Sequence, residues 1–209
     1  SLGLVDSPEA RKAVRSLIDS PDTSVAAAAI TALDSIDGEL AERLGRIVKS
    51  GDPQMIIPAL SALGKGGEAA LPILKFAALQ GHQNGRWVAV NSIGQIGGSQ
   101  AIALLGEILE QGDRQAAMAA AATLASIGGQ DARELLIASA LSDRAQITGA
   151  LAQLAQLEGE DVDAALLVIL EKGSSVAKRA ALPRLLKVGN EKAMAVAIEM
   201  ARSGSRTDK

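Results

Sequence analysis

Few residues of this 209-residue sequence could do chemistry, and the first candidate is its single histidine, His82. Histidine often binds transition metals, but the sequence has no cysteine and no second histidine, so carboxylates would have to complete the site. No carboxylate is adjacent to His82. We therefore interpret His82 as a solvent-facing turn residue and predict neither a metal site nor a cofactor.

Two short motifs resemble catalytic or phosphate-binding sequences. Gly64-Lys-Gly-Gly67 lacks the Gly at position 59 and the following Ser or Thr of a phosphate loop, and no strand precedes it. Ser175-Val-Ala-Lys178 has a Ser-x-x-Lys spacing, but its companion motifs are missing. We interpret the first motif as a turn and Ser175 as a helix cap. The sequence predicts no catalytic residue, and we expect a protein that is not an enzyme.

Three carboxylates, Glu160, Asp161 and Asp163, stand close together at the predicted start of a helix. Negative side chains at a helix N-terminus complement the helix dipole, which explains the group without catalysis. The spacing does not match a calcium-binding loop. We interpret these residues as helix-start electrostatics.

The elements that carry these residues repeat at a nearly fixed interval. A Gly-containing phrase such as Ser92-Ile-Gly-Gln-Ile-Gly-Gly98 recurs along the chain, and its closing positions are 29 to 31 residues apart. A period of this length is typical of a solenoid of stacked repeats. The closing positions are Gly38, Gly67, Gly98, Gly129, Gly159 and Asn190.

Each period contains two predicted helices, a first (A) and a second (B), because the helical apolar spacing breaks near its middle. Asp52-Pro53 reads as a cap followed by Pro at the first helical position, and Asp131 is predicted to cap a helix that ends near Leu141. Aligning the B helices shows one invariant alanine position, which we expect to lie where two helices approach closely. Its members are Ala29, Ala59, Ala89, Ala120, Ala150 and Ala181.

The composition agrees with closely packed helices, because apolar residues make up 48% of the chain and aromatic residues only 1%. The net charge of −3 provides no general basic field for nucleic acid. The longest aliphatic run, residues 164–170, is far shorter than the ~20 residues of a membrane-spanning helix. We expect a cytoplasmic protein without membrane insertion, and a piece of a longer protein because no initiating Met is present.

The segment Leu17–Leu33 and the pair Leu71-Pro72 resemble HEAT repeats, in particular the short bacterial type of about 30 residues first associated with phycobilisome lyases. The resemblance implies an all-α, right-handed, armadillo-like superhelix whose B helices line the concave side. The chain departs from that pattern where Ala26 and Ala177 occupy a position that often holds Arg. HEAT arrays mostly bind other macromolecules, so the resemblance implies an interaction scaffold.

We predict one repeat array over residues 1–203. Both ends carry half repeats without a polar cap, so end-to-end self-association is an expected property. The predicted repeats cover about 7–38, 39–67, 68–98, 99–129, 130–159 and 160–190, with a half repeat at 191–203 and a polar tail at 204–209.

Three successive B-helix segments, 87–96, 115–127 and 145–157, contain no charged residue, whereas the A helices of the same region do. An uncharged inner face is either a binding surface for an unknown protein or peptide partner, or a surface buried by tight curvature. In the first alternative the Trp87 side chain is exposed, whereas in the second it completes the core. The residues predicted to bind the partner are Trp87, Asn91, Gln95, Met118, Ala122 and Thr148.

Two further functions stay open. A basic cluster in the sixth repeat could bind an acidic partner, with nucleic acid less favoured because the chain is acidic and has few aromatic residues to stack bases. A chromophore-handling role like that of the phycobilin lyases is the other. The predicted acidic-partner patch consists of Lys178, Arg179, Arg184 and Lys187.

Overall fold

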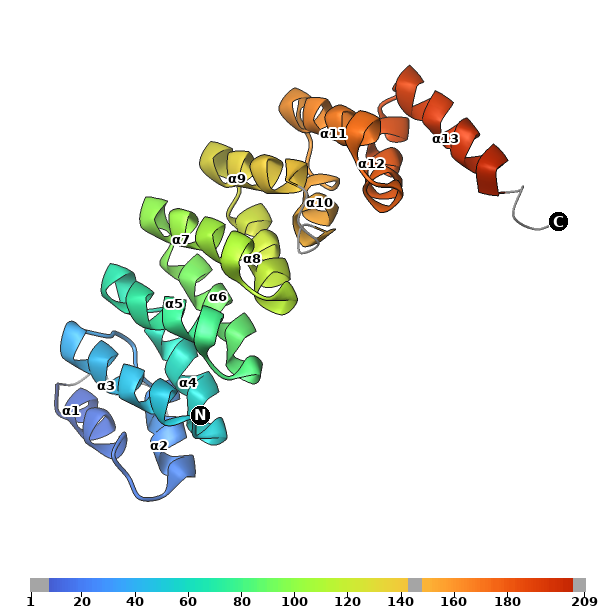
Figure 1. Cartoon of the computed structure of the whole chain (residues 1–209). Coiled ribbons are helices and arrows are strands. Elements are labelled where there is room, and N and C mark those ends of the chain that lie inside the picture. Colours follow the sequence, from blue (N-terminus) through green and yellow to red (C-terminus); the bar gives the residue numbers. More distant parts are fainter. Residues whose placement is uncertain (1–7, 143–147, 205–209) are drawn as a thin grey trace. The chain divides into compact units, whose positions relative to one another are not determined.

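The computed structural model describes residues 8–142 and 148–204, and within these ranges the chain is helical with no strand (Figure 1). The helices are α1 (Pro8–Leu17), α2 (Thr23–Thr31), α3 (Gly38–Ser50), α4 (Pro53–Leu63), the 3₁₀ helix η1 (Gly67–Ala70), α5 (Leu71–Gln80), α6 (Gln83–Ile96), α7 (Gly98–Gln111), α8 (Arg114–Ile127), α9 (Gly129–Leu141), α10 (Thr148–Leu154), α11 (Glu160–Lys172), α12 (Ser175–Lys187) and α13 (Glu191–Gly204). The predicted N-terminal half repeat, residues 1–6, lies outside the described residues, as do residues 205–209 of the predicted tail.

The chain divides into two compact units, residues 1–123 and 124–209, with the boundary inside α8. In the first unit α3 packs on α4 and α5 on α6, while the B helices α2, α4 and α6 pack in succession. In the second unit α9 packs on α10 and α11 on α12, and each pair contacts the next. Helix pairs that stack on their neighbours make an all-α solenoid, as the period predicts. The right-handed sense and the extent of a single array stay predictions.

Local sequence explains where the helices begin and end. Asp52 caps α4 by accepting a hydrogen bond from the backbone N–H of Gln54 at 2.9 Å, and Pro53 occupies the first turn as predicted. Gly97 and Gly98 adopt φ values of 66° and 77°, a left-handed backbone that other residues rarely take. The predicted Asp131 cap of α9 was wrong, because the helix begins at Gly129 and Asp131 lies inside its first turn, whereas the predicted end near Leu141 is confirmed.

The core consists of aliphatic side chains and depends on small residues between neighbouring B helices. All six alanines of the invariant position are buried, five of them completely. Gly85 makes the close approach explicit, because a Cβ atom there would lie 2.9 Å from both Ile56 Cγ2 and Leu60 Cδ1. Helix α6 can therefore pack on α4 only where the side chain is absent or very small.

Candidate protein-interaction surface

A row of exposed apolar side chains follows the B helices of the first unit. Trp87 on α6 is 58% exposed, Met118 on α8 is 47% exposed and Ile57 on α4 is 46% exposed. Each stands two residues before the invariant alanine of its helix. We call Ile57, Trp87 and Met118 the apolar row.

Helix geometry forces this row outward. Residues two apart on an α-helix point about 200° away from each other, since each residue turns the helix by about 100°. Ala59, Ala89 and Ala120 have no exposed surface. Burying these alanines therefore turns the residues two positions earlier toward solvent.

The structure places the predicted residues of the first unit on two helices. Asn91 and Gln95 follow Trp87 by one and two turns of α6, with Asn91 half-buried and Gln95 exposed. Ala122 is exposed one turn after Met118 on α8. The surface alternative for Trp87 thus describes its position better than the core alternative. Thr148 begins α10 in the second unit, and its side chain lies outside the described residues.

The two amide side chains beside Trp87 differ in their contacts. Gln95 lies over the end of α4, because a Cβ atom on Gly64 would stand 2.5 Å from its Oε1. The Asn91 amide makes no side-chain hydrogen bond to any residue within 8–142 or 148–204. Asn91 therefore offers both a donor and an acceptor next to the exposed indole.

Acidic residues are absent from the three helices that carry the row, α4, α6 and α8. Their two charged residues are Arg86 and Arg114. Arg86 forms an ion pair with Asp113, which also accepts a hydrogen bond from the Ala116 N–H at 2.8 Å. Arg114 is exposed one turn before Met118, and no ion pair joins it to another described residue.

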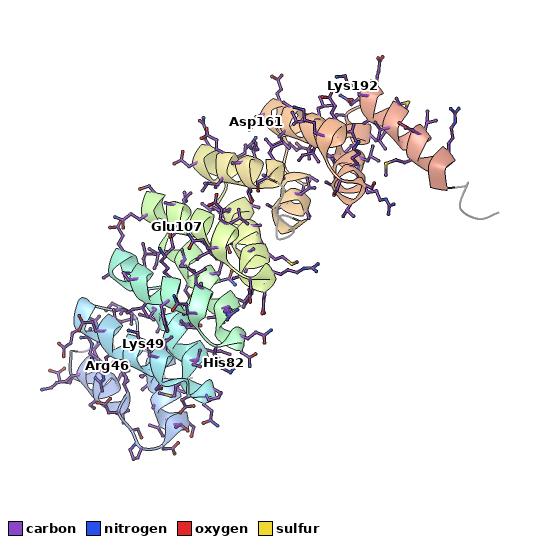
Figure 2. All side chains as sticks on the ribbon, viewed as in Figure 1. Arg46, Lys49, His82, Glu107, Asp161 and Lys192 are labelled. Atoms are coloured by element: carbon purple, nitrogen blue, oxygen red, sulfur yellow. The ribbon has the colours of Figure 1, made fainter. Side chains whose placement is uncertain are left out.

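The A helices carry the charges instead. Lys75 on α5 pairs with Glu107 on α7, and Gln100 Nε2 donates to Glu68 Oε2 at 2.9 Å. Figure 2 shows Glu107 on α7, together with the labelled basic residues Arg46 and Lys49 of α3. The contrast between charged A helices and nearly uncharged B helices is therefore present in the folded first unit.

The basic cluster of the second unit is largely compensated. Arg184 has a side chain only 10% exposed, and its Nε donates to Asp163 Oδ1 at 2.9 Å while its Nη1 lies 3.4 Å from Glu158 Oε1. The hydrogen bond to Asp163 raises the pKa of Arg184 above its ordinary value, although desolvation opposes the shift. Lys187 Nζ lies 3.9 Å from Glu158 Oε1.

Two residues of the predicted acidic-partner patch are less constrained by ion pairs than Arg184 and Lys187. Arg179 is exposed and Lys178 is half-buried on α12. Within the part of the chain that the structure describes, neither side chain has an ion pair. The patch therefore presents fewer uncompensated charges than its four basic residues indicate.

The other chemistry-bearing residues have structural contacts. His82 is the N-cap of α6, and its Nδ1 accepts a hydrogen bond from the Asn84 N–H at 3.4 Å (Figure 2). Residues 64–66 of the Gly64-Lys-Gly-Gly67 motif form the turn between α4 and η1, and Gly67 is the first residue of η1. The prediction that Ser175 caps α12 was wrong by one residue, because the cap is Ser174, whose Oγ accepts from the Ala177 N–H at 3.3 Å.

Two of the three carboxylates at the start of α11, Asp161 and Asp163, are also accounted for by contacts. Asp161 Oδ1 lies 3.1 Å from Arg133 Nη1, and Asp163 pairs with Arg184. Desolvation would raise the pKa of Asp161, but hydrogen bonds from the Val162 N–H and from Arg133 lower it below its ordinary value. Among the described residues, no group of three His, Cys, Asp or Glu side chains could hold a metal ion.

No helix within residues 8–142 and 148–204 is both long and apolar enough to cross a membrane.

Comparison with known families identifies the repeats. A family model described as HEAT repeats matches residues 74–155. This part of the chain consists of HEAT repeats. The matched HEAT segment includes α6 and α8, and thus Trp87 and Met118 of the apolar row. The short bacterial subtype stays a prediction.

No curated protein matches the sequence. Among solved structures, the chain is similar to human deoxyhypusine hydroxylase in complex with glycerol, at 17% identity and a TM-score of 0.44, covering 86% of this chain and 73% of the other. An engineered protein is 17% identical with a TM-score of 0.45, covering 91% and 98%. A designed armadillo repeat protein in complex with the peptide (KR)4 is 15% identical with a TM-score of 0.41, covering 85% and 98%.

Proposed function

We propose that this chain is a non-catalytic scaffold that binds a protein or peptide partner through the exposed side of α4, α6 and α8. The observation that carries the proposal is the apolar row, because three large apolar side chains stand at equivalent positions of successive B helices. Large apolar side chains are exposed elsewhere too, for example Val168 on α11. The row differs because its residues recur in register along the repeats.

The chemistry of the row suits an interface. Tryptophan and methionine are enriched at interface centres, where covering one such side chain contributes roughly 1.5–3 kcal/mol of hydrophobic free energy. Trp87 would be the anchor, with Met118 packed beside it. Asn91 and Gln95 would orient a polar group of the partner.

The residues that could support catalysis are engaged in the fold. His82 caps a helix, Asp161 pairs with Arg133, and Asp163 pairs with Arg184. These contacts support a scaffold over an enzyme. They also leave Arg179 and Lys178 as the basic residues of the predicted patch without an ion pair in the described part of the chain, which weakens the case for nucleic acid.

The test compares Trp87→Ala with Val168→Ala, which truncates an exposed apolar side chain of the second unit. Each variant is used as an affinity bait in cell lysate, and its unfolding is followed by circular dichroism. We expect Trp87→Ala to lose partners that Val168→Ala retains, with the free energy of unfolding changed by less than about 0.5 kcal/mol. Retention of every partner by Trp87→Ala contradicts the proposal.

A further inference from the structure

We infer that Asn84, at the start of α6, is a modification site that loses ammonia and becomes aspartate or isoaspartate when the first turn of the helix opens. Three observations carry the inference: Asn84 is exposed, the residue after it is Gly85, and the hydrogen bond that caps this turn is long. The inference does not depend on the proposed function, although Asn84 lies one turn before Trp87.

The reaction needs only Asn84, Gly85 and water. The backbone nitrogen of Gly85 attacks the side-chain Cγ atom of Asn84 and loses its proton, the bond from Cγ to the amide nitrogen breaks, and ammonia leaves. Water then opens the resulting cyclic imide at one of its two carbonyl carbons. The product is either aspartate or isoaspartate, whose main chain passes through the former side chain. A side chain on the following residue hinders the attack, so glycine makes the preceding asparagine most reactive.

Packing explains why glycine follows Asn84. A Cβ atom on Gly85 would lie 2.9 Å from both Ile56 Cγ2 and Leu60 Cδ1 of α4. Helix α6 therefore keeps its contact with α4 only if residue 85 has no side chain or a very small one. The close approach of the two helices thus requires a small residue at the position where glycine leaves Asn84 most reactive.

The first turn of α6 protects Asn84 only while it stays closed. The Gly85 N–H donates a hydrogen bond of 2.9 Å to the His82 carbonyl, and helical ψ values hold the Gly85 nitrogen away from the Asn84 side chain. The cap is weak, because His82 Nδ1 accepts from the Asn84 N–H at 3.4 Å, whereas the Asp52 carboxylate that caps α4 accepts at 2.9 Å. Opening of the turn frees the Gly85 nitrogen, so the rate of reaction follows how often the turn opens.

The other amides at comparable places are less reactive. Asn91 and Asn190 are the other asparagines of the chain, and they are followed by serine and glutamate. Asn91 lies inside α6, and the side-chain oxygen of Asn190 accepts a backbone hydrogen bond of 3.1 Å at the start of α13. Gln54 and Gln115 occupy the register position of Asn84 in α4 and α8, but their longer side chains form a larger ring, which closes more slowly.

The two products change α6 in different ways. An aspartate at position 84 keeps the main chain unchanged and places a carboxylate in the first turn, where it complements the helix dipole. An isoaspartate adds a main-chain atom next to Gly85, which is buried against α4, so the first turn loses its packing. Either product brings a negative charge within one turn of Trp87, on a helix that has no acidic residue of its own.

The experiment incubates the whole chain in mildly alkaline buffer at body temperature and follows each asparagine by peptide mapping and mass spectrometry. We expect Asn84 to convert about tenfold faster than Asn91 or Asn190, with aspartate and isoaspartate both present at position 84. Asn84→Gln is the matched control, because it keeps the amide and should show almost no conversion there. Conversion of Asn84 no faster than that of Asn91 overturns the inference.

A variant of the cap tests whether opening of the turn controls the reaction. Aspartate caps helices better than histidine, so His82→Asp should slow the conversion of Asn84 about three- to fivefold in the folded chain. In urea the cap is absent, and we expect the unaltered chain and His82→Asp to convert Asn84 at the same rate. Equal rates in the two folded chains would contradict control by the first turn.

The separated products test the packing argument. The aspartate form should melt at the temperature of the Asn84→Asp variant, and the isoaspartate form should melt lower. Equal melting temperatures of the two forms would contradict the loss of packing beside Gly85. These measurements involve no partner, so their failure leaves the proposed function standing.

Discussion

The hydroxyl of Ser92 donates a hydrogen bond of 2.8 Å to the backbone carbonyl of Leu60, joining α6 to α4. Ser92 is buried, and Leu60 lies in the last turn of α4, where carbonyl groups have no partner within the helix. One repeat therefore completes the hydrogen bonding of the helix before it. This contact couples neighbouring repeats within the first unit.

Replacing Ser92 tests that coupling. We expect Ser92→Ala to lower the free energy of unfolding by about 1–2 kcal/mol, because the carbonyl of Leu60 would be buried without its donor. Ser61→Ala is the matched control, since Ser61 is an exposed serine on the neighbouring B helix α4. Urea denaturation measures both, and equal effects of the two substitutions would refute a specific role for Ser92.

The invariant alanines give a second prediction. Ala120→Leu and Ala150→Leu should each destabilise the chain by about 1–3 kcal/mol, because both positions are fully buried and a larger side chain would overpack them. Ala122→Leu is the control on α8, where the side chain is exposed and little change is expected. Chemical denaturation checks the values. Neutral results at both buried positions would mean that the faces of the B helices are assigned incorrectly.

Acid should remove the contribution of the Asp37 cap. A hydrogen bond from the Leu40 N–H, together with Arg15, lowers the pKa of Asp37 in the folded chain below its ordinary value of 3.8. A carboxyl with a lower pKa in the folded state contributes stability above its unfolded pKa and loses it as the pH falls through the folded value.

Thermal melts between pH 6 and pH 2 test this linkage. We expect the difference in melting temperature between the unaltered chain and Asp37→Asn to be constant above about pH 5 and to shrink below pH 3.8. Asparagine keeps the capping oxygen without the charge. A difference that does not depend on pH would show that the charge of Asp37 makes no contribution.

The ion pairs of Arg184 give a fourth prediction. Arg184→Met should lower the melting temperature more than Lys187→Met, because the Arg184 side chain is 10% exposed and pairs with both Asp163 and Glu158. The Lys187 side chain is 75% exposed and lies 3.9 Å from Glu158. Differential scanning calorimetry at low and moderate salt measures both. An equal or larger effect of Lys187→Met would contradict a structural role for Arg184.

Much of this fold can be predicted from the sequence, because each repeat packs its helices in the same way and so needs the same residue types at the same positions. The invariant alanines predict the buried side of each B helix, and Asp52-Pro53 predicts the start of α4. The exact caps were harder to predict. Two adjacent serines stand at the start of α12, and either side chain could cap the helix by its type, while Gly128 with its positive φ lets α9 begin before Asp131.

The candidate surface was only partly predictable. The Ala-centred apolar pattern allows Trp87 to lie in the core or at the surface, and only the folded helix places the side chain outward. Ile57 was missed because the uncharged segments were traced from Trp87 onward, although the repeat register aligns it with that residue. The pairing of Arg184 with Asp163 joins residues 21 positions apart on two helices, and composition alone contains no signal of it.

The most direct test of the central claim is the fluorescence of Trp87, because it is the only tryptophan of the chain and reports on no other site. Emission and acrylamide quenching are measured for the free chain and for its complex with a captured partner that lacks tryptophan. The account predicts the emission of a solvent-exposed indole in the free chain, then a blue shift and protection from quenching in the complex. A buried indole in the free chain, or an unchanged spectrum in the complex, would contradict binding through the apolar row.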